Sequence, residues 1–301
     1  MRTRILCILV LILISRCARA ADVPDSKLKI GDSSITIQFS AQVSDNLRAL
    51  VEGWIRDSAD AVNTVYGSYP VKQVTIAVRV TSGGRVSHGV TFRGRLIRIQ
   101  VGSDVTREVL RADWVMTHEM FHLGFPDTDA DWIGEGLSTY MEPLARARAG
   151  QLSAEAVWAS MIDGLPKGLP QSGDRGLDRT PTWGRTYWGG ALFWLLADIE
   201  IRRNSANRKS LDDALRAIVA EGGTGAADWP EAKIFSRGDA AISMPVLQNL
   251  HERLGAHSET TDLAALLKQL GISQDGRKVT FHDDAPLAAI RRALTGAKGA
   301  N

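Results

Sequence analysis

The chain of 301 residues carries 36 basic and 34 acidic side chains and has a formal net charge of +2 at pH 7. This length is sufficient for one large domain or two lobes with their own apolar core. The sequence has no basic run interleaved with aromatic residues, which argues against a nucleic-acid-binding protein, and no apolar stretch after residue 20 approaches membrane-spanning length.

The first twenty residues have the features of a secretory signal peptide. Two arginines precede an apolar run at residues 5–14, and Ala18-Arg19-Ala20 supplies small residues for cleavage. We therefore expect an exported protein, periplasmic or extracellular, that is cleaved after Ala20. Lipid attachment at Cys17 is the weaker alternative, because an arginine precedes it. Both cysteines lie in this segment, so the mature chain would contain no disulfide.

Removal of this segment would also change the charge. It takes away four arginines and leaves 32 basic against 34 acidic groups, a net charge of −2. The mature chain is therefore expected to be nearly neutral.

Alternation of apolar and polar residues indicates a strand-rich first part. Residues 22–30 are polar, and we expect them to form a mobile leader. After them, period-two alternation predicts strands and period-3.6 spacing predicts one helix. The expected elements are strands at 35–39, 74–80 and 97–101 and a helix at 47–65. We therefore place an N-terminal lobe, built on a small mixed sheet with a helix, at residues 21–104.

After Asp104 the pattern changes to helical spacing, and strands nearly vanish. The expected helices are at 105–123, 132–149, 153–163, 186–204, 209–221, 243–254, 258–270 and 284–294. A stretch rich in glycine, proline and charge at 164–181 interrupts them, and we expect it to form a long ordered loop. The chain thus predicts an α+β fold with two lobes, of which the second, residues 105–301, is mostly helical.

The segment His118-Glu119-Met120-Phe121-His122 places two histidines four residues apart on an expected helix. Side chains at that spacing lie on one face with Cβ atoms about 5–6 Å apart, so both imidazoles can bind one metal ion. Glu119 is rotated by about 100° from His118 and lies beside such an ion, which is the position of a general base. Apolar residues at helical spacing around the motif indicate that this helix packs into a core.

A second helix is expected to begin near Trp132, and Glu135 lies in its first turn. Asp129 or Asp131 is available as its N-cap. Glycine and proline end the preceding helix soon after the second histidine, so a short helix–turn–helix brings Glu135 toward the two imidazoles. Two histidines, one glutamate and one water form the ligand set of a catalytic zinc ion, and the pattern predicts one such ion per chain.

These motifs resemble those of the gluzincin zinc metallopeptidases, including the aminopeptidase N and glycyl aminopeptidase families. The matching residues are His118-Glu119-x-x-His122, Trp132-x-x-Glu135-Gly136-x-x-Thr139-Tyr140 and Tyr187-Trp188-Gly189-Gly190-Ala191-Leu192, the last being similar to a glycyl aminopeptidase pattern. The resemblance covers about residues 110–220 and implies a thermolysin-like two-lobed catalytic unit. It also implies that the Tyr187 hydroxyl stabilises the tetrahedral intermediate.

The chain departs from these families upstream of the histidines. The large aminopeptidases carry a Gly-x-Met-Glu-Asn motif on an edge strand, whose glutamate holds the substrate amine, whereas this chain has Ser87-His88-Gly89-Val90-Thr91-Phe92. An edge strand can still bind an extended peptide by main-chain hydrogen bonds, which need no particular side chain. The sequence therefore leaves open whether the activity is that of an exopeptidase or an endopeptidase.

We expect an exported zinc-dependent peptidase that acts on peptide or protein substrates, with His118, His122 and Glu135 as metal ligands. A zinc ion bound there would lower the pKa of its water ligand to about 7, and Glu119 would take up the proton. The alternative is a catalytically silent gluzincin-like module that binds peptides or an envelope partner. Hydrolysis of another amide or an ester is a third, weaker hypothesis.

Other polar and aromatic residues have plainer explanations. The remaining histidines show no ligand spacing among themselves, so we expect no function for His88, His251, His257 and His282. The tryptophans near the motifs are expected to pack beneath the site; they are Trp114, Trp132, Trp183, Trp188 and Trp194. Asp178, Arg179 and Arg185 either contact a substrate carboxylate or brace the loop at 164–181, and the sequence leaves both open.

Overall fold

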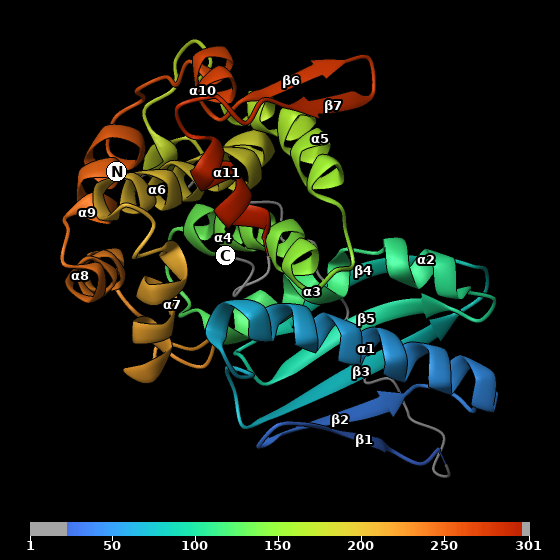
Figure 1. The fold of residues 1–301 in the computed structure, drawn as a ribbon. Coiled ribbons are helices and arrows are strands. Elements are labelled where there is room, and N and C mark those ends of the chain that lie inside the picture. Colours follow the sequence, from blue (N-terminus) through green and yellow to red (C-terminus); the bar gives the residue numbers. More distant parts are fainter. Residues whose placement is uncertain (1–22, 297–301) are drawn as a thin grey trace.

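A computed structural model describes residues 23–296 (Figure 1). The expected signal peptide and the last residues of the C-terminal tail, 297–301, lie outside the described residues. Within residues 23–296, none of the helices is both long and apolar enough to cross a membrane.

A five-stranded mixed sheet forms the first part of the fold. Its strands are β1 (Ser26–Ile30), β2 (Ser33–Phe39), β3 (Gln73–Thr81), β4 (Val86–Phe92) and β5 (Leu96–Gly102). The spatial order is β1-β2-β3-β5-β4, with β2, β3 and β5 parallel and the two edge strands antiparallel to their neighbours. The three central strands and their turns agree with the alternation in the sequence.

One face of this sheet carries the core. The inward apolar positions of the central strands are at most 4% exposed; they are Ile35, Ile37, Phe39, Val74, Ile76, Val78, Ile97, Ile99 and Val101. Helix α1 (Asp45–Tyr66) lies across the sheet in Figure 1, and the Ser44 hydroxyl caps its first turn by accepting from the amide of Leu47 at 3.2 Å. Burial of period-two and period-3.6 apolar faces against each other thus builds the first part of the molecule.

The expected mobile leader at residues 22–30 is wrong for most of its length. Residues Ser26–Ile30 form strand β1, which pairs antiparallel with β2. Leu28 and Ile30 are buried, whereas the alternating lysines Lys27 and Lys29 are exposed. Two apolar residues are too few to predict a strand in a segment of otherwise polar composition. The segment is ordered because the open edge of β2 supplies main-chain hydrogen bonds to it.

The rest of the described chain is mostly helical. Its helices are α2 (Arg107–Ala112), α3 (Val115–Phe121), α4 (Asp131–Arg148), α5 (Ala154–Gly164), α6 (Gly190–Ser205), α7 (Leu211–Ala220), α8 (Glu231–Ile242), α9 (Val246–Leu250), α10 (Leu263–Gln269) and α11 (Ala288–Thr295). Helices α3 and α4 lie between the sheet and the other helices (Figure 1). Two short strands, β6 (Ile272–Asp275) and β7 (Lys278–Phe281), form a hairpin that the sequence analysis did not predict.

Several helix expectations need correction. The expected helix at 105–123 is broken at Asp113, whose carboxylate accepts from the amides of Val115 and Met116 at 3.0 and 3.4 Å and so starts a new helix. Helix α8 was not predicted at all. Neither Asp129 nor Asp131 caps α4, because its N-cap is Ala130, which makes no side-chain capping bond.

The loop at 164–181 is ordered, as expected, and is held by buried polar contacts. It contains two short helical turns, η2 (Leu165–Gly168) and η3 (Leu177–Arg179). Arg185 is 5% exposed, and its guanidinium forms an ion pair with Asp174, with 2.9 Å between Nε and Oδ2. A buried guanidinium of this kind fixes the loop, because an unpaired charge would be costly there.

Candidate metal centre

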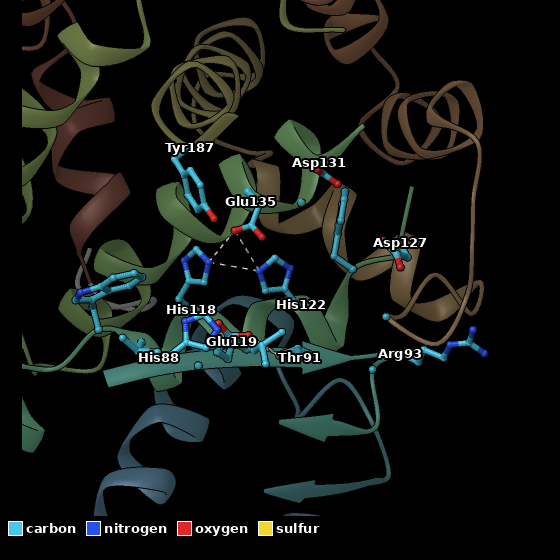
Figure 2. A pocket seen from close by; sticks show the side chains of 18 of the residues that line it. His88, Thr91, Arg93, His118, Glu119, His122, Asp127, Asp131, Glu135 and Tyr187 are labelled. Atoms are coloured by element: carbon cyan, nitrogen blue, oxygen red, sulfur yellow. Dashed lines mark hydrogen bonds and ion pairs between the residues drawn. The ribbon is translucent and has the colours of Figure 1, made fainter. Parts of the chain in front are cut away.

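The two histidines and Glu135 converge on one point, as Figure 2 shows. His118 lies on α3, His122 directly follows α3, and Glu135 lies in the second turn of α4. Glu135 Oε2 is 3.1 Å from His118 Nε2 and 3.6 Å from His122 Nε2, and the two Nε2 atoms are 3.4 Å apart. The structure therefore brings together all three residues that the sequence predicted as metal ligands.

Backbone hydrogen bonds fix the short link between α3 and α4. The amide of Asp127 donates to the carbonyl of Ala227 at 2.9 Å, and the amide of Trp229 donates to the carbonyl of Asp127 at 2.9 Å. This pairing with a distant segment holds the turn in place, so Glu135 returns to the histidines without a long connection. The positioning depends on residues 227–229 and cannot be derived from the motif itself.

This donor set fits a zinc ion. Two donors bonded at about 2.0–2.2 Å to one tetrahedral ion lie roughly 3.4 Å apart, which matches the three observed separations. Burial opposes ionisation of Glu135, yet hydrogen bonds from both imidazoles hold its pKa well below the usual range. Burial lowers the pKa of His118, so this ring favours the neutral form that binds metals.

Glu119 lies beside these ligands, on the side of the edge strand. Its residue is 7% exposed, and the Thr91 hydroxyl lies 2.8 Å from its Oε2 and 2.9 Å from its main-chain carbonyl oxygen. Gly89 allows this approach, because a Cβ there would come within 2.5 Å of Val115 and 3.0 Å of the Glu119 side chain. Strand β4 and α3 therefore meet at the carboxylate that was assigned as general base.

Sequence reasoning missed the contribution of Thr91. Residues Gly89 and Thr91 are two apart on β4 and both contact Glu119, as the period of a strand requires. The apolar alternation of β4 is weak in the sequence Val86–Phe92, and its pairing with β5 is irregular between Val86 and Gly89. The sequence pattern that could have indicated this role is the hydroxyl of Thr91, two residues after Gly89 on the strand expected to bind substrate.

Tyr187 completes the constellation from the other side. It lies on a π-helical turn, η4 (Gly184–Gly189), where an uninterrupted α-helix was expected, and its ring centroid is 6.4 Å from that of His118. Figure 2 shows its hydroxyl directed toward Glu135. Burial, with smaller effects of Glu135 and Glu119, raises the pKa of Tyr187 to about 12, so the phenol keeps its proton at neutral pH and can donate a hydrogen bond.

A contact between two glycines sets the distance between Tyr187 and Glu135. Gly136 and Gly190 lie at the crossing of α4 and α6, and a Cβ on Gly136 would come within 2.4 Å of the Gly190 backbone. A Cβ on Gly190 would come within 2.2 Å of the Trp132 carbonyl oxygen. Because Gly136 directly follows Glu135 and Gly190 lies three residues after Tyr187, close packing of the two backbones places both side chains at one site.

An open cleft of about 680 Å³ runs past these residues. Residues 86–91 of β4 form one wall, so the edge strand faces the cleft as expected. One end is polar, with Arg93, Asp127 and Asp131. Trp114 also lines the cleft. His88 is exposed and also lines the cleft, although the sequence analysis assigned it no function.

The tryptophans follow the packing expectation only in part. Trp132 and Trp194 are 3% and 0% exposed and belong to the core, whereas Trp114 and Trp183 are 52% and 62% exposed. Trp114 meets the His118 ring edge-on at 5.3 Å between centroids, and Trp183 lies 5.9 Å from Tyr187. Two exposed indoles therefore flank the candidate site, where burial beneath it was predicted.

Asp178, Arg179 and Arg185 brace the loop at 164–181. Arg185 pairs with Asp174, and the Arg179 guanidinium donates to the carbonyl of Ala256. Asp178 accepts from Trp132 Nε1 at 3.0 Å and also contacts His251. Of the two alternatives that the sequence left open, the contacts among residues 23–296 favour the structural one.

No protein-family model matches the sequence, and no curated protein matches it. Among solved structures, the chain is similar to an aminopeptidase N family protein of Idiomarina loihiensis, with a TM-score of 0.57 and 14% identity over 83% of this chain and 49% of that chain. A mutant M1 zinc metallopeptidase of Deinococcus radiodurans bound to a Tyr-Ser-Ala substrate gives a TM-score of 0.50 and 16% identity over 79% of this chain and 51% of that chain.

The chain thus spans about half the length of these solved neighbours. At such low identity the similarity establishes the fold alone. The chain therefore shares a mixed α+β fold with these metallopeptidase structures, which agrees at this coarser level with the fold expected from the motifs.

Proposed function

We propose that the protein is an exported zinc-dependent peptidase, with His118, His122 and Glu135 as metal ligands. The observation that carries the proposal is the position of Glu119, a buried carboxylate oriented by Thr91 beside the converging donors. A module that only bound peptides would have no use for such a carboxylate. The gluzincin-like fold supports the same conclusion.

The chemistry assigned to the chain is acid–base catalysis of peptide hydrolysis. When bound, zinc supplies Lewis acidity that activates water and polarises the scissile carbonyl. Glu119 accepts a proton from the attacking water and later delivers it to the leaving amine as the C–N bond breaks. The neutral Tyr187 hydroxyl donates a hydrogen bond to the developing oxyanion, a contact typically worth about 10²–10³ in rate.

The walls of the cleft support a peptide substrate with a bulky apolar side chain. The edge strand β4 offers unpaired main-chain groups to an extended peptide. Trp114 and Trp183 present exposed indoles next to His118 and Tyr187, where an aromatic or aliphatic side chain of the substrate would bury them. Trp183→Ala should lower kcat/KM for such peptides. Thermal stability should stay unchanged, because Trp183 is 62% exposed.

The decisive experiment compares wild type with Glu119→Gln, both loaded with zinc, on a broad peptide library. The amide keeps the shape of the side chain and an oxygen for Thr91, so zinc content and fold should be unchanged while turnover falls by about 10²–10⁴. If wild type cleaves nothing and both proteins bind peptides equally well, the chain is a silent binding module and the peptidase proposal fails.

A further inference from the structure

A second group of metal-binding side chains lies away from the cleft. Asp178 of the turn η3, Glu231 at the start of α8 and His251 at the start of a π-helical turn (His251–Gly255) place one donor atom each within 4.8 Å of the others. His251 Nε2 is 3.0 Å from Asp178 Oδ2 and 3.5 Å from Glu231 Oε2. We propose that these three residues bind a second divalent transition-metal ion, with zinc as the ion that suits them best.

The geometry of this group matches that of the first site. The two nitrogen–oxygen separations, 3.0 and 3.5 Å, compare with 3.1 and 3.6 Å between Glu135 and its two histidines. Donors bonded at about 2.1 Å to one ion are separated by roughly 3.0–3.4 Å at octahedral to tetrahedral angles. A single imidazole with two carboxylates favours zinc over calcium or magnesium, which prefer oxygen ligands alone.

Neighbouring side chains hold the donors in position. Trp132 Nε1 donates to Asp178 Oδ1 at 3.0 Å, which leaves Oδ2 directed at His251. The His251 ring stacks on Trp132, with centroids 6.4 Å apart and planes at 11°, and also contacts Phe235 at 5.0 Å. Supporting contacts of this kind orient the ligands of established metal sites.

Protonation of His251 would provide a hydrogen bond to only one of the two carboxylates. One Nε2–H can donate to Asp178 at 3.0 Å, but 3.5 Å is too long for a good hydrogen bond to Glu231 as well. Among residues 23–296, the Glu231 carboxylate makes no other hydrogen bond or ion pair, and Asp129 adds further negative charge nearby. The neighbouring Arg179 is directed to the carbonyls of Arg175 and Ala256.

The proposed ion would brace three segments that are distant in sequence. It would connect the loop at 164–181 with α8 and with the turn after α9, all of them against Trp132 on α4. The three side chains are 25–30% exposed, so an ion can enter from solvent and water can complete its coordination. The role is structural, and it is independent of whether the first site turns over peptides.

Zinc content after dialysis tests the proposal. We expect two zinc ions per wild-type chain and one in His251→Ala. His257→Ala is the matched control, because this exposed histidine of the same segment bonds only to Glu252 among the described residues, and it should retain two. Glu231→Gln, which changes a partly exposed first-turn residue, gives the same information if His251→Ala does not fold.

The variant His122→Ala distinguishes the two sites, because it should lose the first ion and keep the second. His122→Ala combined with Glu231→Gln should bind no zinc. Added zinc should raise the thermal midpoint of His122→Ala and leave that of the double variant unchanged. One ion in wild type that persists in His251→Ala and Glu231→Gln would overturn the second site. Two ions in wild type that both persist in these variants would place the extra ion elsewhere and overturn it equally.

Discussion

Replacing Thr91 by valine should impair catalysis without disturbing the metal or the fold. Valine has the shape of threonine and suits a strand, so the change removes only the hydroxyl that lies 2.8 Å from Glu119 Oε2. A hydrogen bond to a charged group contributes about 1.5–3 kcal/mol. At about 1.4 kcal/mol for each factor of ten, its loss should reduce kcat by roughly 10–100-fold.

The assay is steady-state hydrolysis of a peptide taken from the library screen, together with zinc content and the thermal midpoint. KM should stay nearly constant, because Thr91 acts on the general base and does not hold the substrate. Thr91→Ser keeps the hydroxyl and should restore most of the activity. In the Glu119→Gln background, Thr91→Val should have little further effect, since the residue it positions no longer acts as a base.

A purely structural role for Thr91 would give a different pattern. Activity would then fall by the same factor in both backgrounds, together with the thermal midpoint, and serine would bring no recovery. Either that pattern or a valine variant within about twofold of wild type in kcat would refute the positioning role, since the hydrogen bond at issue is charge-assisted.

Three further outcomes are expected. Tyr187→Phe should lower turnover by about 10²–10³ at unchanged zinc content, because it removes only the oxyanion donor; equal turnover would exclude that role. Gly190→Ala should lower the free energy of unfolding by about 1–3 kcal/mol, because its Cβ would meet the Trp132 carbonyl at 2.2 Å. Gly53→Ala, on an open face of α1, is the control and should be neutral or stabilising in chemical denaturation. Burial raises the pKa of Asp113 from 3.8 to about 6, so its ionisation favours the unfolded chain, and wild-type stability should fall by about 1–3 kcal/mol between pH 4 and pH 6. Asp113→Asn keeps the cap and should reduce this slope, while burial of Glu142, which raises its pKa to about 7, leaves a remainder; an identical slope in both proteins would contradict the assignment.

The sequence predicted those features whose physical cause is local. Residues 118 and 122 share a helix face because of helical geometry alone, and the central strands follow from alternation that one buried face imposes. Glu135 was predicted correctly to approach the histidines because only a short turn separates the two helices. The metallopeptidase-like fold was expected from three motifs, at 118–122, 132–140 and 187–192, each of which spans only a few turns of helix.

The features that the sequence did not predict depend on contacts between distant segments. Strand β1 is ordered by the free edge of β2, and its own composition is that of a flexible leader. The break at Asp113 was not predicted either, and it leaves α3 with only seven residues, too few for a stable isolated helix; the helix survives because Met116 to Phe121 are all buried. The donors at Asp178, Glu231 and His251 are brought together from three separate elements, so no spacing along the chain reveals them.

Trp132 connects the two groups of donors through one turn of helix. Its indole fixes Asp178 and stacks on His251, while its main-chain carbonyl lies where α4 meets Gly190. Three residues later on the same helix, Glu135 faces His118 and His122. Side chains that bind a catalytic metal must be held to within about 0.5 Å, and the contacts of Trp132 add to the rigidity that α4 has from its own hydrogen bonds. The loop at 164–181 therefore supports the candidate site indirectly. Its Asp178 holds Trp132, which lies in the first turn of α4, one turn before Glu135.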